Sequence, residues 1–159
     1  MKRKKSGFTL IEMTIVLALT VLIIGIASSI FITGNKVFAD SDVKTTLQME
    51  AKDIQEKLSD ICMQASGAEE IAEGIKISSM GTSMVIKISG NILYIAELDT
   101  ENNEKNSTKK ILTENLDINP NKIKLNGYSV TFNLILQKNK GYTKTQQPIN
   151  FTVAFRNRS

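Results

Sequence analysis

Glu12 is the residue of this sequence whose placement most demands a chemical explanation. It is the only charged side chain between Phe8 and Ile32. A carboxylate in an apolar helix costs roughly 3 kcal/mol when that helix enters a membrane, so such a residue is a candidate functional site. Its natural partner is a positive charge at the same depth, and the spacing therefore predicts an ion pair. The alternative is that Glu12 lies at the headgroup interface and pairs with nothing.

Other chemistry finds little support in the sequence. The chain has no histidine, which removes the commonest general base and metal ligand. Cys62 is the only cysteine, so we expect no internal disulfide and no zinc cluster, and we interpret Cys62 as a small core residue. Asp99, Glu101 and Glu104 do not follow a calcium-loop order and are better read as a solvated loop. We predict no enzyme activity, no metal and no cofactor.

The N-terminus combines a basic leader with a long apolar run. Lys2, Arg3, Lys4 and Lys5 carry the whole net charge of +4, a distribution that keeps an N-terminus in the cytoplasm. As a helix, the run from Phe8 to Ile32 would be about 37 Å long, enough to cross a membrane. Ordinary signal-peptide cleavage near residues 27–29 or 37–39 is the alternative, although the run is long for a signal peptide.

A short motif joins the leader to the apolar run. The sequence Gly7-Phe8-Thr9-Leu10-Ile11-Glu12, after basic residues, resembles the class III signal peptide of type IV prepilins and pseudopilins. The resemblance implies cleavage by a prepilin peptidase between Gly7 and Phe8, and N-methylation of Phe8. It also implies that Glu12 pairs with the terminal amine of a neighbouring subunit and so sets the register of assembly.

The resemblance implies a life cycle as well. The subunit would first be a single-pass prepilin in the inner or cytoplasmic membrane with its head outside, and later part of a cell-surface filament for adhesion, motility or DNA uptake. Its partners would be the prepilin peptidase, other pilin subunits and the pilus assembly machinery.

The sequence departs from many major pilins at one position. Ser29 stands where these proteins carry a proline that loosens the helix; here Gly25, Ser28 and Ser29 would have to serve that purpose. The departure favours a minor pilin or a pseudopilin over the main filament subunit, and we interpret the chain as a minor pilin. A pseudopilin of a type II secretion or competence system is the alternative, and a singly anchored surface binding protein that does not polymerise is an alternative of another class.

The predicted cleavage, membrane and assembly residues must be held in place by helices and strands. We predict a removed leader over residues 1–7, a long helix over 8–66 with its membrane or filament-core part at 8–32, and a β-rich head over 67–159. Apolar residues at steps of four and three predict a buried stripe on the second half of the helix. Its members are Val43, Leu47, Ala51, Ile54, Leu58, Ile61 and Ala65.

The head is predicted to be an antiparallel sheet packed on that stripe, which gives an α+β, pilin-like roll. Gly90-Asn91 predicts a hairpin between strands at residues 84–89 and 92–98. Further strands are expected at residues 110–113, 122–125, 128–137 and 149–155.

The last part of the chain is basic. Residues 118–159 contain seven basic side chains and no acidic one. Exposed lysines could guard sheet edges, complement the acidic helix of a neighbouring subunit, or contact DNA or another anionic surface. Lys138, Lys140 and Lys144 are the candidates for the last of these contacts.

Overall fold

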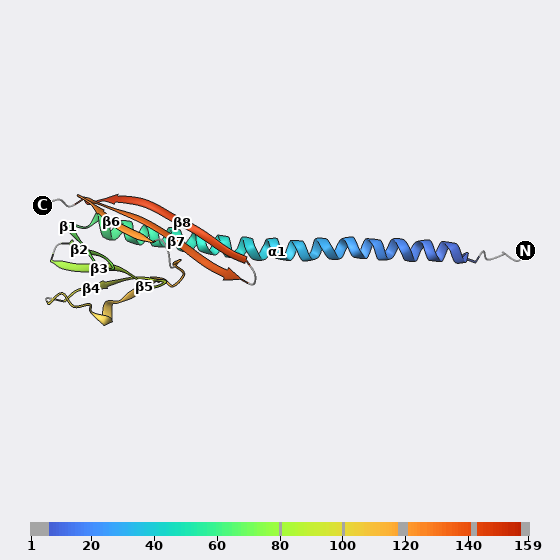
Figure 1. Ribbon diagram of the computed structural model, residues 1–159, viewed down its shortest axis with the longest axis horizontal. Coiled ribbons are helices and arrows are strands. Elements are labelled where there is room, and N and C mark those ends of the chain that lie inside the picture. The colour runs from blue at the N-terminus through green and yellow to red at the C-terminus, as the bar shows by residue number, and fades with distance from the viewer. Residues whose placement is uncertain (1–6, 80, 100, 118–120, 141–142, 157–159) are drawn as a thin grey trace, which may run out of the picture. The chain divides into compact units, whose positions relative to one another are not determined.

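The computed structural model describes residues 7–79, 81–99, 101–117, 121–140 and 143–156. The chain divides into two compact units, Met1–Ser41 and Asp42–Ser159. We call the first the stem unit and the second the head unit. Figure 1 shows the elements of both along the chain.

Helix α1 (Leu10–Met63) contributes to both units. No proline interrupts the sequence before residue 120. Leucine and alanine favour the helix in its apolar part, and leucine, methionine, lysine and glutamate favour it in its later part. The helix ends at Met63, ahead of the expected boundary at residue 66, because the first strand already begins at Gly67. The long helix that the sequence predicts is therefore present.

One face of α1 is buried in the head unit. Its buried residues recur at helical spacing and are Val43, Leu47, Ala51, Ile54, Leu58 and Cys62. Ile61, expected in this stripe, is only partly buried, and its neighbour Cys62 takes the fully buried position. Burial raises the pKa of the Cys62 thiol to about 12, so this side chain is an unreactive core residue, as predicted.

Five strands form a consecutive antiparallel sheet. They are β1 (Gly67–Ile71), β2 (Gly74–Ser79), β3 (Thr82–Ser89), β4 (Ile92–Glu97) and β5 (Lys110–Thr113). The predicted hairpin at Gly90 is confirmed, and Gly90 adopts the left-handed conformation (φ 62°) that favours glycine in such turns. Strand β1 was not predicted, because its polar Glu69 and Glu70 hide the apolar alternation.

A second sheet contains three strands in the order β6-β7-β8. Their bounds are β6 (Lys122–Asn126), β7 (Ser129–Lys140) and β8 (Thr143–Ala154). Strands β7 and β8 are longer than predicted, since backbone pairing continues through polar residues as far as Lys140↔Thr143. The short 3-10 helix η1 (Asn106–Thr108) lies in the loop before β5.

The core of the head unit lies between the buried stripe of α1 and the two sheets. Fully buried side chains from both sheets, including Ile75, Ile86, Phe132 and Leu134, join the stripe in one cluster. The backbone N–H of Leu125 in β6 donates to Glu70 Oε1 in β1 at 2.8 Å and so links the sheets. The α+β architecture is confirmed, although two sheets are present where one was expected.

Candidate functional site

The short segment before helix α1 is exposed. Residues 7–9 are non-helical, and the side chain of Phe8 is 81 % exposed. A Cβ atom placed on Gly7 would have no heavy atom within 4 Å, and Gly7 does not adopt a positive φ. Other side chains would therefore fit at position 7 of the fold. If glycine is required there, the requirement must come from another molecule that binds this segment.

Thr9 and Glu12 cap the start of helix α1 reciprocally. The backbone N–H and the hydroxyl of Thr9 donate to Glu12 Oε2 at 2.8 and 2.9 Å, and the Glu12 N–H donates to Thr9 Oγ1 at 3.3 Å. This is a capping box, which satisfies N–H groups that the first helical turn leaves unpaired. The capping role of Thr9 was not predicted, although Thr-x-x-Glu before an apolar run is the known sequence signal of a capping box.

The negative charge of Glu12 is not neutralised by a basic side chain among the described residues. The ion pair found in that part of the chain joins Lys87 and Glu104 in the head unit. Lys2, Arg3, Lys4 and Lys5 lie outside the described residues. The cap uses Oε2 of Glu12, and no residue in the described part of the chain hydrogen-bonds to Oε1.

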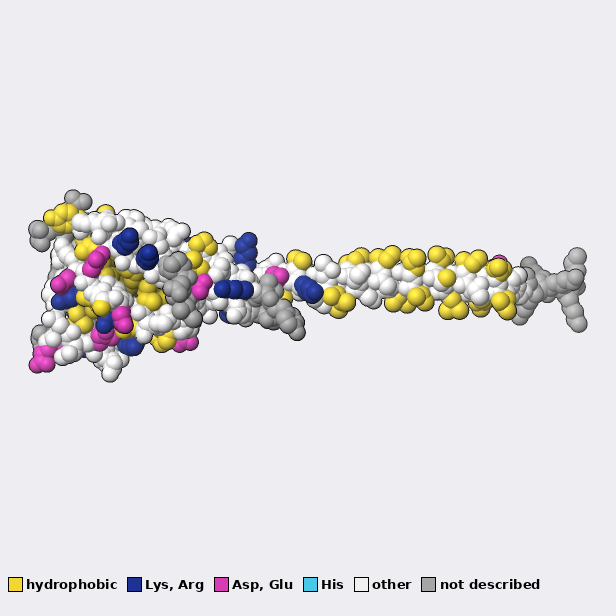
Figure 2. Space-filling view, viewed as in Figure 1, with side chains coloured by type: hydrophobic (Ala, Val, Ile, Leu, Met, Phe, Trp, Pro, Cys, Tyr) yellow, Lys and Arg dark blue, Asp and Glu magenta, His cyan; other side chains and the backbone are white. Residues whose placement is uncertain are grey.

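The stem unit exposes apolar side chains along most of its length (Figure 2). Helix α1 is long and apolar enough to cross a membrane, by length and composition. The side chains exposed by more than half along its first part include Leu10, Ile11, Val16, Leu17, Val21, Leu22, Ile23, Ile24, Ile30, Phe31 and Ile32. Such a surface needs an apolar environment, either lipid or other helices.

The hydroxyl groups of the stem are satisfied within the helix. Thr20, Ser28 and Thr33 donate to carbonyls four residues earlier at 2.7, 2.8 and 2.9 Å, and Ser29 donates to Ile26 O at 3.2 Å. This bonding lets polar residues enter an apolar environment and slightly weakens the helical ladder. The helix nevertheless continues without a break through Gly25, Ser28 and Ser29.

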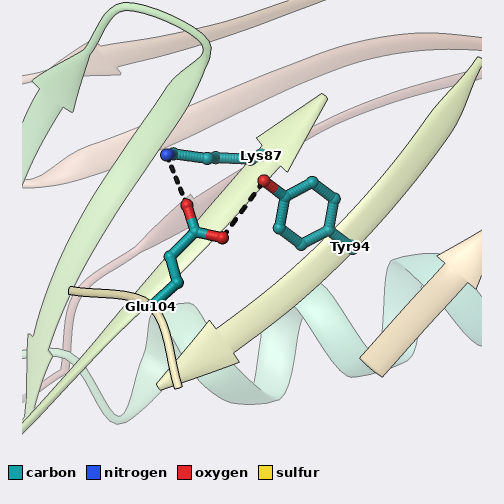
Figure 3. A network of polar contacts seen from close by, with 3 residues as sticks. All are labelled: Lys87, Tyr94 and Glu104. Carbon is teal, nitrogen blue, oxygen red and sulfur yellow. Dashed lines mark hydrogen bonds and ion pairs between the residues drawn. The ribbon is translucent and has the colours of Figure 1, made fainter. Parts of the chain in front are cut away.

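A polar network fixes the loop between β4 and β5 on the head (Figure 3). Lys87 Nζ lies 2.5 Å from Glu104 Oε1, and the Tyr94 hydroxyl donates to Glu104 Oε2 at 3.3 Å. The hydrogen bond with Glu104 raises the pKa of Lys87, and the same bond lowers the pKa of Glu104. Burial raises the pKa of Tyr94. The network holds together at neutral pH and weakens when Glu104 is protonated in acid.

Asp99, one of the three acidic residues considered above as a calcium loop, is hydrogen-bonded to the backbone of its own loop. Asp99 Oδ1 accepts hydrogen bonds from the N–H groups of Glu101 and Asn103, both at 2.9 Å. Within the described residues, no group of three or more acidic or cysteine side chains is arranged to hold a metal ion.

The candidate lysines of the head do not form one basic face. Lys138 pairs with Thr145 and Lys144 pairs with Asn139, so the side chains of the two lysines leave opposite faces of the sheet. Both line an open groove of about 690 Å³, together with the carboxylates of Glu114 and Asp117. The backbone of Lys140 lies in β7, while its side chain is outside the description.

The position of Pro148 supports the interpretation that the lysines of the head protect a sheet edge from pairing with another chain. Ile135 donates its N–H to Asn121 Oδ1 and accepts from the N–H of Asp117, so its backbone polar groups point away from β8. Its cross-strand partner Pro148 must then point away from β7, toward the free edge of β8. Proline and lysine on an edge strand hinder pairing with another chain.

The comparisons with known proteins bear on the N-terminal segment. Residues 2–28 match the family described as prokaryotic N-terminal methylation motif, which is the class III signal peptide of type IV pilins. No curated protein and no solved structure matches the chain. The matched segment contains Gly7, Phe8, Thr9 and Glu12. It points to a structural subunit rather than an enzyme.

Proposed function

We propose that this type IV pilin-like or pseudopilin precursor is a filament subunit, in particular a minor pilin of a type IV pilus or related filament. Prepilin peptidase cleaves the bond between Gly7 and Phe8, and the new amine of Phe8 is methylated. The subunit waits in the membrane as a single-pass protein with its head outside. The assembly machinery then moves it into a cell-surface filament beside other pilin subunits.

The observation that carries this proposal is the state of Glu12. Its carboxylate begins the apolar stem, is held by Thr9, and has no basic partner among the described residues. Cleavage creates a positive amine on Phe8, and the amine of a neighbouring subunit supplies the missing charge. An unpaired charge in an apolar interior costs about 3–5 kcal/mol, so the correct register is strongly preferred.

The exposed stem supports the same conclusion. Its apolar side chains are solvated by lipid before assembly and by sister helices afterwards, so transfer between the two environments exposes little apolar surface to water. Gly25 and Gly34 leave open space beside the helix, which permits close approach of another helix.

The serine at position 29, where many major pilins carry a proline, favours a minor subunit or a pseudopilin over the main filament subunit. Gly25, Ser28 and Ser29 remain helical here, and we propose that any loosening at these residues occurs only during assembly. A pseudopilin of a type II secretion or competence system would use the same stem. A singly anchored binding protein would instead keep its leader and need no charge on Glu12.

Cleavage tests the proposal directly. Replacing Gly7 with valine is expected to reduce processing by a prepilin peptidase about tenfold or more, because a site shaped for glycine rejects a branched side chain. The fold has open space at this position, so the stability of the head remains unchanged. The processed fraction is measured by mass spectrometry after expression with the peptidase.

Gly67→Ala is the matched control, because Gly67 also has open surroundings but lies far from the leader in sequence. This variant is expected to be processed normally. If Gly7→Val were cleaved between residues 7 and 8 as fast as the parent chain, the assignment of this peptide bond would be wrong.

A further inference from the structure

The β7–β8 hairpin carries its positive charge at one end. Lys138 near the end of β7 and Lys144 near the start of β8 are both exposed. In the sequence, Lys140 is a third lysine between these two, and no acidic residue occurs between positions 138 and 144. We call Lys138 and Lys144 the basic tip.

The basic tip lies at the end of the head unit where α1 enters it. At the other end of the hairpin, the Arg156 N–H donates to the carbonyl of Met63 at the end of α1. From Arg156 back to Lys144, a strand covers about 40 Å. From Met63 back to Asp42, the helix covers about 32 Å. The hairpin therefore runs the whole length of the helical part of the head unit, as Figure 1 shows for β7 and β8.

The same end of the head unit is tethered close to the apolar run. Asp42, where the head unit begins, follows Ile32 by only ten positions. Ten residues of helix rise by about 15 Å. This short connection lets charges at this end of the head unit come within about one Debye length of the membrane surface, roughly 8–10 Å, where lipid headgroups attract them.

We infer that the basic tip rests on the anionic phospholipid headgroups of the membrane while the precursor waits for assembly. This inference depends on the membrane-inserted stage of the proposed function. Each lysine close to an anionic membrane favours contact about fivefold, so the two lysines together favour it about thirtyfold. The contact would hold the head in one orientation relative to the membrane plane.

The neighbouring charges agree with this placement. Glu114 and Asp117 share a groove with the basic tip, but the backbone of Asp117 pairs with Ile135, which places it farther from the end of the hairpin. Asp117 Oδ2 also accepts a hydrogen bond from Gln146 Nε2 at 2.7 Å. On the part of α1 that belongs to the head unit, Asp42 is offset by Lys44. The outermost charges of the hairpin are therefore the lysines.

The geometry favours a membrane over DNA. Lys138 and Lys144 leave opposite faces of the sheet, so a rod-shaped duplex lying on either face would meet only one of them. A plane that crosses the end of the hairpin can meet both. A short basic tip also supplies few phosphate contacts for a nucleic acid.

A probe at the tip tests the inference in the full-length chain. Asn139→Cys places a thiol between the lysines, and a fluorophore attaches there selectively because Cys62 is buried and its pKa is about 12. The labelled protein is inserted into nanodiscs of phosphatidylcholine, with or without phosphatidylglycerol. A lipid with a nitroxide on its headgroup quenches the fluorophore at short range.

The inference predicts strong quenching only with phosphatidylglycerol, and its loss in high salt. Lys138→Gln combined with Lys144→Gln is expected to shift the contact equilibrium about thirtyfold toward release. Lys122→Gln combined with Lys124→Gln removes the same charge from β6 and is expected to leave the quenching unchanged.

Three outcomes would overturn the inference. The first is equal quenching in neutral and anionic nanodiscs. The second is an equal effect of the tip and β6 variants. The third is an unquenched tip whose lysines are instead needed to retain DNA on the full-length protein. Co-elution of the protein with nanodiscs separates these results from a failure of the proposed function, because a chain that does not insert fails at that earlier step.

Discussion

Replacing Glu12 with glutamine is expected to abolish filament assembly, by about a hundredfold or more, while cleavage between Gly7 and Phe8 continues. Glutamine can still cap Thr9, because a capping box accepts either side chain. It cannot neutralise the amine of a neighbouring subunit, which leaves that charge unpaired among apolar helices at a cost of about 3–5 kcal/mol. Sheared filaments and membranes are assayed for the processed subunit.

Thr9→Ala is the matched control for the Glu12 variant. It removes the hydroxyl that takes part in two of the three capping hydrogen bonds, but it keeps the carboxylate. A lost helix cap costs about 1 kcal/mol, so assembly is expected to fall by less than about tenfold. If Thr9→Ala stopped assembly and Glu12→Gln did not, the importance of Glu12 would lie in helix capping and the ion-pair mechanism would be wrong.

Replacing Gly74 with alanine is expected to lower the free energy of unfolding of the head by about 3 kcal/mol, at the upper end of the cost of overpacking. Gly74 begins β2 and faces Lys87 in β3. A Cβ atom on Gly74 would collide with the carbonyl oxygen of Ile86, and backbone in the middle of a sheet cannot move aside cheaply. Denaturant unfolding of the full-length chain in detergent measures the loss.

Gly67→Ala provides the comparison for this variant as well. Gly67 begins the neighbouring strand β1, and a Cβ atom there would meet nothing within 4 Å. We expect a change within about 0.5 kcal/mol, as is usual for open surface positions. Equal losses in the two variants would mean that the close approach at Gly74 does not limit the packing of the sheet.

The sequence predicted the elements in which one physical signal dominates. The helical stripe from Val43 to Leu58 follows a 3.6-residue period, and Gly90-Asn91 supplies the left-handed turn that a hairpin needs. The leader motif likewise combines charge, a glycine and an apolar run in a fixed order. These features are local, so no knowledge of distant contacts is required.

Features that depend on long-range pairing were not predicted. The polar ends of β7 and β8 are strands because each pairs with the other, not because their side chains alternate in polarity. The division into two sheets depends on where β5 stops pairing and β6 begins, which no local pattern records. The ion pair between Lys87 and Glu104 joins residues that are distant in sequence, and such a partnership also requires the fold.

Thr9 differs from these cases because its signal was present in the sequence. The capping box lies inside the leader motif, and its residues overlap those of the predicted cleavage and assembly signal. The structure shows that one carboxylate oxygen of Glu12 already holds the helix start in the separate subunit. We therefore expect the same side chain to serve two purposes, capping before assembly and charge pairing during it.

Processing at Gly7 and Phe8 can be read from the mass of the N-terminal peptide of the protein taken from its native membrane or filament. We expect a peptide that begins at Phe8 and is heavier by one methyl group. A peptide that begins at Met1 or Lys2 would show an uncleaved anchor, and one that begins well beyond Phe8 would show ordinary signal-peptide cleavage. Either of these results would contradict assembly through a methylated Phe8 and Glu12.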